Sequence, residues 1–205
     1  MFYVWSENTG RDTVNLADPT TRNYKTVSEI WEKNSIVSVS PDGLNILFYP
    51  DGNLGAENKI GLTSPDGKMW KTIISGGYNY GVLWSPDGKR FLYGKKDPRV
   101  QTYQLWVYDL QTGDTKGLGL YTIPDKAVWS QDGTTVYVAA PKSGAVGIGS
   151  TDDSFYDVNI TTLERKEHVT GTGSSPVDAR EMFLSRDGLK LFFKANQDGS
   201  LYYLD

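Results

Sequence analysis

Four aspartates in a repeated Ser-x-Asp-Gly phrase are the most regular set of residues that could do chemistry. A ring of four carboxylates could hold a metal ion or act in general acid catalysis. However, Ser at the first position, the preset φ of Pro at the second and Gly at the last suit a tight type I turn. We therefore interpret the Asp-Gly pairs as structural turn residues. They are Asp42 and Gly43, Asp87 and Gly88, Asp132 and Gly133, and Asp187 and Gly188.

Nucleophilic catalysis has little support in the sequence. The chain contains no cysteine, which excludes disulfides, thiolate catalysis and cysteine-based zinc sites. A Ser-His-Asp triad would have to use the one histidine, His168, which lies in the charged stretch LERKEHV and is expected to be solvated on an outer strand. The GxSxG elbow of the α/β-hydrolases does not occur either. We therefore predict no catalytic residue, no cofactor and no enzymatic activity.

A metal site would need oxygen ligands at a suitable spacing. The loop 50–58, PDGNLGAEN, offers Asp51, Asn53 and Glu57, but it lacks the spacing of an EF-hand calcium loop. The paired acids Asp152 and Asp153 are also expected in a loop. We interpret loop 50–58 as an ordinary polar hairpin and predict no metal site, with calcium binding there as the alternative.

Composition narrows the classes of partner. The 205 residues carry a formal net charge of -4, so there is no basic surplus that would favour nucleic acid. No run approaches the roughly 20 apolar residues that a membrane span needs, and the opening MFYVWSE lacks the basic region of a signal peptide. The 13 Tyr and 6 Trp suit half-buried positions in β-sheets. We expect no nucleic-acid binding and no direct membrane insertion.

The elements that position these residues follow from an internal repeat. The glycines of the four phrases WSPDGKRFLY, VSPDGLNILFY, WSQDGTTVYVA and LSRDGLKLFFK are separated by 45, 45 and 55 residues. A second phrase, seen in GLTSPDGKMWKTI and VYDLQTGDTKGL, recurs at a similar distance. Each unit is expected to form four short strands, from an apolar inner strand to a polar outer one. Trp84 and Trp129 end two inner strands and are predicted to pack in the core.

A four-stranded antiparallel sheet of about 45 residues, repeated around an axis, is a β-propeller blade. The phrases WSPDGKRFLY and WSQDGTTVYV resemble the WD40-like "PD40" repeats of the TolB-type β-propellers, and the resemblance covers essentially the whole chain. The sequence departs from that pattern in the VSPDG and LSRDG copies, which lack the usual Trp, and in the longer third spacing. The resemblance implies an extracytoplasmic setting, in the periplasm or at the cell surface.

The predicted fold is all-β, with about 18 strands in five blade positions. Three blades are complete and two are partial, because Met1–Glu7 aligns with a second strand and SLYYLD with a third strand. The ring either closes with five blades or forms an arc of a larger propeller, whose exposed terminal blades could drive self-association. We expect one domain, 1–205. The approximate blades are 1–31, 32–76, 77–122, 123–171 and 172–205.

Function is expected on the loops, because propellers bind through loops gathered on one face of a rigid scaffold. Two loop sets should share a face, namely those between second and third strands and those joining consecutive blades. Aromatic and basic side chains are favoured anchors in protein interfaces, although some of these aromatics could instead fill the central channel. The candidate partner-binding residues are Trp31, Tyr78, Tyr80, Lys95, Lys96, Arg99 and Tyr121.

The sequence thus predicts a non-catalytic scaffold that binds a protein or peptide partner through these loops. The alternative is a gating or substrate-selecting propeller domain of a larger peptidase or other hydrolase. Similar repeats precede catalytic domains in prolyl-oligopeptidase-like and tricorn-like peptidases, so in that case the chemistry would lie outside these residues.

Overall fold

The computed structural model describes residues 2–6, 12–18, 20–21, 23–30, 35–50, 59–97, 99, 102–142, 151–168 and 176–204. The chain divides into two compact units, Met1–Asn79 and Tyr80–Asp205, which are described separately. The described residues form 18 strands and one turn of 3-10 helix, which confirms the all-β prediction and its strand number. None of the described residues belongs to a helix long and apolar enough to cross a membrane.

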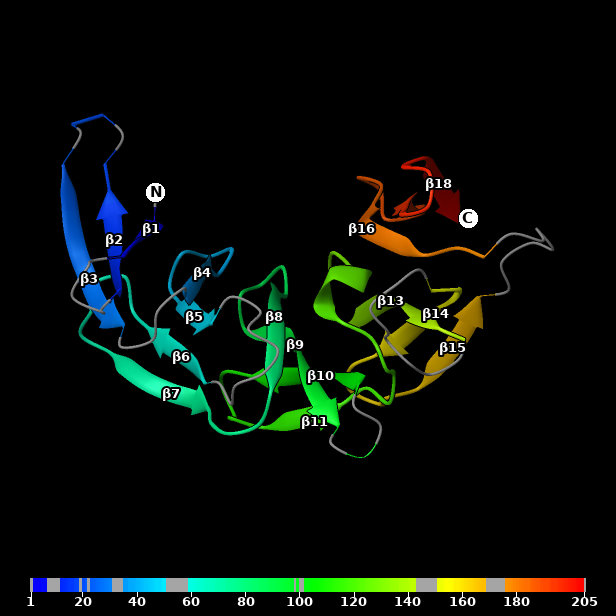
Figure 1. The fold of residues 1–205 in the computed structure, drawn as a ribbon, viewed down its shortest axis with the longest axis horizontal. Helices are drawn as coiled ribbons and strands as arrows, with labels where there is room; N and C mark the ends of the chain where they lie inside the picture. The colour runs from blue at the N-terminus through cyan, green and yellow to red at the C-terminus, as the bar shows by residue number, and fades with distance from the viewer. Residues whose placement is uncertain are drawn as a thin grey trace. The chain divides into compact units, whose positions relative to one another are not determined.

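Unit 1 contains two antiparallel sheets with the strand orders β1-β2-β3 and β4-β5-β6-β7 (Figure 1). Their core combines Val14 and Val27 from the first sheet with Ile46 and Phe48 from the second. The strands are β1 (Phe2–Ser6), β2 (Asp12–Ala17), β3 (Tyr24–Ile30), β4 (Ser35–Val39), β5 (Ile46–Pro50), β6 (Ile60–Thr63) and β7 (Trp70–Ile74).

Unit 2 contains three antiparallel sheets with the orders β8-β9-β10-β11, β12-β13-β14-β15 and β16-β17-β18. The 3-10 turn η1 (Pro124–Lys126) leads into the second of them. The strands are β8 (Asn79–Trp84), β9 (Arg90–Asp97), β10 (Thr102–Asp109), β11 (Thr115–Gly117), β12 (Ala127–Trp129), β13 (Thr135–Pro141), β14 (Asp153–Asn159), β15 (Arg165–His168), β16 (Ala179–Leu184), β17 (Leu191–Ala195) and β18 (Leu201–Leu204).

Three four-stranded sheets between two three-stranded ones match the five predicted blade positions. The burial gradient also matches, because β9 and β13 are mostly buried whereas β11 and β15 are mostly exposed. A radial sheet requires this gradient, since its inner strands pack against neighbouring blades and its last strand faces solvent. Whether the blades close into a ring or form an arc stays a prediction, as do the domain and blade boundaries.

The Ser-x-Asp-Gly phrases form the turns between first and second strands. In the β8–β9 turn, the Ser85 hydroxyl donates to Asp87 Oδ1 over 2.6 Å, and the Lys89 N–H donates to the same carboxylate oxygen over 3.1 Å. The Arg90 N–H in turn donates to Ser85 Oγ over 2.9 Å, and Gly88 has a φ of 67°. The serine and aspartate therefore satisfy backbone donors that a turn alone would leave unpaired.

The other copies repeat this geometry, with Asp42 accepting from Ser40, Asp132 from Ser130 and Asp187 from Ser185. Their glycines also have positive φ: 72° at Gly43, 68° at Gly133 and 75° at Gly188. A fifth copy, Ser64 to Gly67, forms the β6–β7 hairpin between a third and a fourth strand. The phrase therefore encodes one local turn, whichever strands it joins.

The core of unit 2 confirms the predicted role of the two tryptophans. Trp84 and Trp129 are 9% and 5% exposed, and the Trp129 indole N–H donates to the Leu83 carbonyl oxygen over 3.2 Å. Trp84 packs edge-on against Phe91 with ring centroids 5.6 Å apart, and Phe91 stacks on Tyr108 at 5.1 Å. These contacts join the inner strands into a rigid base for the loops.

Candidate functional site

The topology of unit 2 decides which loops lie together. In an up-and-down sheet the loop between second and third strands lies at the same end as the entry to the first strand. We call this the loop end of unit 2. It comprises the described residues of the β9–β10, β13–β14 and β17–β18 loops and of the segments leading into β12 and β16. The Ser-x-Asp-Gly turns between first and second strands lie at the opposite end, so their carboxylates do not contribute to it.

The structure places the predicted binding residues unevenly. Trp31 lies outside the described residues, as do residues 51–58 of loop 50–58, which was interpreted as a polar hairpin with calcium binding as the alternative. Tyr80 belongs to β8, but its side chain lies outside the described part. Tyr78 is half-buried in the β7–β8 connection of unit 1. The loop end of unit 2 therefore collects the remaining four, Lys95, Lys96, Arg99 and Tyr121.

Lys95 and Lys96 were predicted in a loop, and that placement is wrong. Both lie on β9, where Lys95 pairs with Gln104 and Lys96 pairs with Tyr103 of β10. The β9–β10 hairpin continues through the two lysines because the backbone hydrogen bonds between strands do not depend on side-chain polarity. Lys95 Nζ lies 5.2 Å from the ring centroid of Trp106, a cation–π distance that holds the ammonium against the sheet.

Arg99 and Tyr121 meet on a carboxylate that the sequence analysis missed. Arg99 Nε and Nη2 lie 3.2 Å and 3.0 Å from the two oxygens of Asp97, and the Tyr121 hydroxyl lies 3.4 Å from Asp97 Oδ2. Hydrogen bonds from Arg99 lower the pKa of Asp97, and the same pair raises the pKa of Arg99. The signal in the sequence that could have revealed Asp97 is its place two residues before Arg99.

Asp97, Arg99 and Tyr121 form a trio in which the arginine is both held in place and exposed to solvent. The Arg99 side chain is 85% exposed, whereas that of Asp97 is only 10% exposed. The carboxylate therefore anchors one edge of the guanidinium while most of the arginine faces solvent. A planar cation held in one orientation loses little entropy when it binds, which is how interface anchors gain affinity.

A second cluster, buried at the same end, joins two neighbouring sheets. Lys126 of η1 is fully buried, and its Nζ lies 2.7 Å from Asp153 Oδ2 and 2.6 Å from Asp178 Oδ1. The Thr151 hydroxyl lies 2.6 Å from the same ammonium, and Asn196 donates to the other oxygen of Asp178 over 2.9 Å. We call these residues the Lys126 network.

The Lys126 network has a structural role. Burial would raise the pKa of Asp178, but hydrogen bonds from Lys126 and Asn196 outweigh it and hold that pKa below its ordinary value. The prediction that Asp153 lies in a loop is wrong, because it is the buried first residue of β14. Its partners are distant in the sequence, so no local pattern could reveal them.

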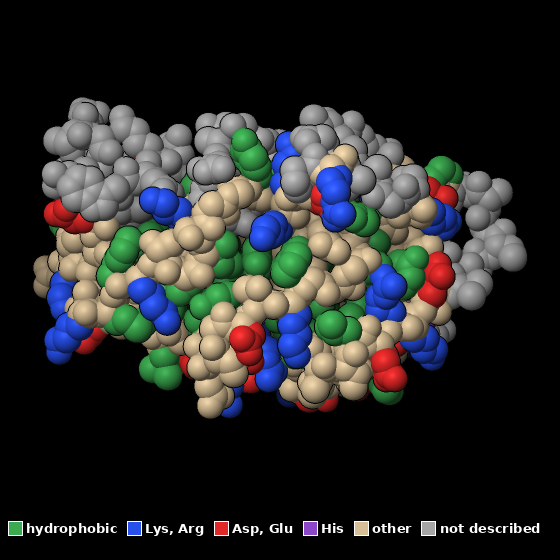
Figure 2. Space-filling model, turned by 90° about the horizontal axis from the view of Figure 1, so that it is seen from below, with side chains coloured by type: hydrophobic (Ala, Val, Ile, Leu, Met, Phe, Trp, Pro, Cys, Tyr) green, Lys and Arg blue, Asp and Glu red, His purple; other side chains and the backbone are tan. Residues whose placement is uncertain are grey.

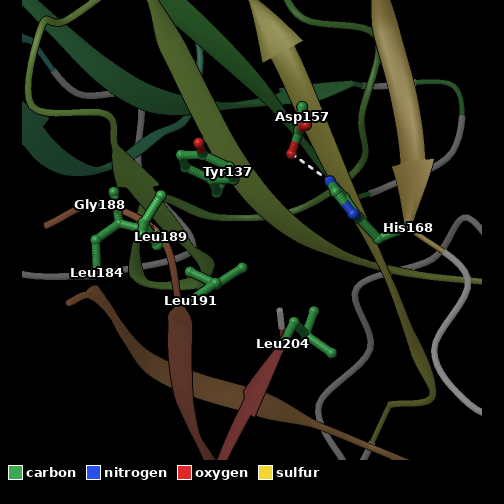
Figure 3. A pocket seen from close by; sticks show the side chains of 8 residues that line it. All are labelled: Tyr137, Asp157, His168, Leu184, Gly188, Leu189, Leu191 and Leu204. Atoms are coloured by element: carbon green, nitrogen blue, oxygen red, sulfur yellow. Dashed lines mark hydrogen bonds and ion pairs between the residues drawn. The ribbon is translucent and has the colours of Figure 1, made fainter.

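His168 differs from the prediction in its surroundings. It lies on the outer strand β15 as expected, but it is half-buried and its Nε2 lies 2.5 Å from Asp157 Oδ1. Figure 3 shows this pair and Tyr137 on one side of a small cavity, with leucines of the next sheet on the other. Leu189, in the β16–β17 turn, also lines this cavity.

The pair has the geometry that orients a catalytic imidazole, but no Ser, Thr or Cys stands among the described residues that line this cavity of about 150 Å³. The described residues also contain no group of three or more His, Asp or Glu side chains placed to hold a metal ion.

Figure 2 shows Lys and Arg side chains spread among hydrophobic and acidic ones on the face in view, and not gathered in one basic patch.

Comparison with protein-family models finds no match, and comparison with curated proteins finds none. Among solved structures, TolB from Acinetobacter baumannii is 21% identical with a TM-score of 0.62, and the match covers 99% of this chain and 52% of that one. Oligogalacturonate lyase from Vibrio parahaemolyticus is 13% identical with a TM-score of 0.69, covering 94% and 54%.

The β-propeller domain of the Trilobed protease from Pyrococcus furiosus is 15% identical with a TM-score of 0.58, covering 100% of this chain and 68% of that one. The chain thus spans about half the length of TolB and of the lyase. Likeness at such identities shows the fold alone. With its sequential antiparallel sheets, the chain has a TolB-like β-propeller fold.

Proposed function

We propose that this chain is a non-catalytic binding scaffold that engages a protein or peptide partner through the loop end of unit 2. One observation carries the proposal: Arg99 is highly exposed yet held in one orientation by Asp97, beside Tyr121. Arginine and tyrosine dominate the binding energy of many protein interfaces. Such a trio adds little to stability on its own, because exposed ion pairs contribute little.

The chemistry of the loop end indicates the kind of partner. Lys95 and Arg99 present two cations, one held against Trp106 and one held by Asp97. Fixed cations beside aromatic rings suit a partner surface with acidic and apolar side chains. We further propose that the repeats are PD40 repeats of the TolB type and that the protein works outside the cytoplasm.

The proposal is tested by partner capture with matched variants. The immobilised chain is exposed to an extract of the source cells, and captured proteins are compared between wild type, Arg99→Ala and Arg186→Ala. Arg186 is an exposed arginine in the β16–β17 turn, at the opposite end of the sheets. A specific partner should bind at least about tenfold less to Arg99→Ala and normally to Arg186→Ala. Equal capture by all three would refute a role for Arg99.

The second candidate is a propeller domain that selects substrates for a larger peptidase. It is favoured by the likeness to the propeller domain of the Trilobed protease, which this chain covers to 68%. Sequencing the parent gene on both sides of the chain distinguishes the two. A neighbouring segment with a GxSxG elbow would support the peptidase, whereas further Ser-x-Asp-Gly blades would support the scaffold.

A further inference from the structure

The loop end of unit 2 also contains a cavity that neither proposal uses. Its volume is about 550 Å³, within the usual range for small-ligand sites. It lies between η1, the start of β16 and the β17–β18 turn. The lining residues are Asp125, Arg180, Glu181, Lys194, Ala195, Asn196 and Gly199.

The charges around the cavity are balanced but not all paired. Lys194 Nζ lies 3.2 Å from Glu181 Oε1, and Arg180 Nε lies 3.3 Å from Asp178 Oδ1. Within the described part of the chain, the Asp125 carboxylate has no hydrogen bond or ion pair. Burial raises the pKa of Asp125, and the nearby Arg180 lowers it. The Asp125 residue is exposed beside the cavity, so its carboxylate is open to a hydrogen-bond donor of a ligand.

Arg180 supplies the complementary charge. Its Nε is turned towards Asp178, a member of the buried Lys126 network, so the side chain is anchored to a rigid support. Within the described part of the chain, the Arg180 side chain has no other hydrogen bond or ion pair, so its two Nη groups are open to a planar anion such as a carboxylate.

The backbone beside Arg180 is irregular. Glu181 has a φ of 49°, a left-handed conformation that costs energy in a residue with a side chain. The register of β16 against β17 shifts between Arg180 and Phe183, which marks a β-bulge. β-Bulges often redirect side chains next to binding sites. This one lies at Arg180 and Glu181, two charged residues that line the cavity.

We propose that this cavity binds a short zwitterionic peptide, whose ammonium group contacts Asp125 and whose carboxylate contacts Arg180. A simple cation would meet Arg180 beside Asp125, and a simple anion would meet Asp125 and Glu181. A ligand that carries both charges could pair with Asp125 and with Arg180. A single amino acid would fill only part of the cavity volume. This site goes beyond the proposed partner binding, because it does not involve Arg99.

The test is calorimetric titration of the full chain with trialanine and with N-acetyl-trialanine amide, which has the same length but no terminal charges. Trialanine should bind, and the capped peptide should bind at least about tenfold more weakly. Asp125→Asn and Arg180→Gln should each weaken trialanine binding by a similar factor. Asp114→Asn removes one exposed carboxylate from the β10–β11 hairpin at the opposite end and should bind like wild type.

Thermal unfolding of each variant distinguishes a lost contact from a lost fold, and Asp125→Asn is decisive because it changes no contact of the Lys126 network. Equal binding of free and capped peptide, no binding of either, or full affinity in Asp125→Asn would overturn the proposal. Arg99→Ala should bind trialanine normally, so failure of the partner proposal would leave this one standing. Affinity should fall as the pH is lowered through the raised pKa of Asp125.

Discussion

Two turn glycines have almost the same backbone conformation but different surroundings. Gly43 has a φ of 72° with no heavy atom within 4 Å of the position that a Cβ would take. Gly67 has a φ of 73°, and a Cβ there would clash with the carbonyl oxygen of Val27. Both positions disfavour a side chain through φ, and only Gly67 adds a clash with the backbone of the neighbouring sheet.

We therefore expect Gly43→Ala to lower the free energy of unfolding by about 1 kcal/mol, through the left-handed φ alone. Gly67→Ala should cost about 1–3 kcal/mol more, because the backbone of Val27 or of the turn must move. Urea unfolding followed by tryptophan fluorescence measures both. Equal losses would show that the approach to Val27 carries no energetic weight.

The turn aspartates make the fold sensitive to acid. Hydrogen bonds from the Ser64 hydroxyl and the Lys68 N–H lower the pKa of Asp66 from 3.8 to about 2. Hydrogen bonds from the turn serines also lower the pKa of Asp132 and Asp187. A pKa that is lower in the folded state contributes stability above the unfolded value, and this is lost as the pH falls through the folded value.

Stability should thus decline between about pH 3.8 and about pH 2. Ser64→Ala should make the decline shallower, because the variant loses its largest pKa-lowering hydrogen bond. Comparing urea midpoints on either side of this window measures the effect. The control is Ser75→Ala, an exposed serine outside the turns. An identical decline in wild type and Ser64→Ala would contradict the role given to this hydrogen bond.

At the scale of elements, the sequence was informative where the cause is local. Strand periodicity and turn chemistry act within about ten residues, so the strands and their order followed from the repeat. The extent of β9 was missed because the two successive lysines break the apolar alternation that marks the strand, although both pair with β10. The Lys126 network was missed entirely, since its lysine and aspartates are brought together only by the packing of two sheets.

The Lys126 network gives a prediction at this scale. Lys126→Met should lower the free energy of unfolding by about 3–5 kcal/mol, because Asp153 and Asp178 would stay buried without their counter-charge. Lys142→Met breaks a pair with Asp152 at 2.9 Å in which both side chains are nearly half exposed. That change should cost less than about 1 kcal/mol.

Both variants keep a long unbranched side chain, so the difference reports on the buried charges and not on volume. The thermal midpoint and the urea midpoint should agree in ranking the two. Similar small losses would show that water or a shifted side chain compensates the two aspartates.

For the whole molecule, the repeat predicts the architecture far better than the function. A propeller blade is specified by turns and strand patterns that recur in every copy, whereas a binding site depends on residues that differ between copies. Arg99 and Tyr121 could be nominated from residue type, but their meeting on Asp97 depends on the folded loop end. Structures of the same fold include TolB and a lyase, so fold alone leaves the activity open.

The activity of the whole chain is therefore a matter for direct measurement, and we expect no hydrolysis of ester or peptide reporters. The Ser85 hydroxyl is committed to its turn, where it donates to Asp87 and accepts from the Arg90 N–H. His168 and Asp157 form a pair within one sheet, which is not the sheet that carries Ser85. The cavity beside this pair is lined in part by leucines. Activity that survives both His168→Ala and Ser85→Ala would point to a contaminant. Activity that either change abolishes in a folded protein would show that the chain is an enzyme and that the scaffold proposal is wrong.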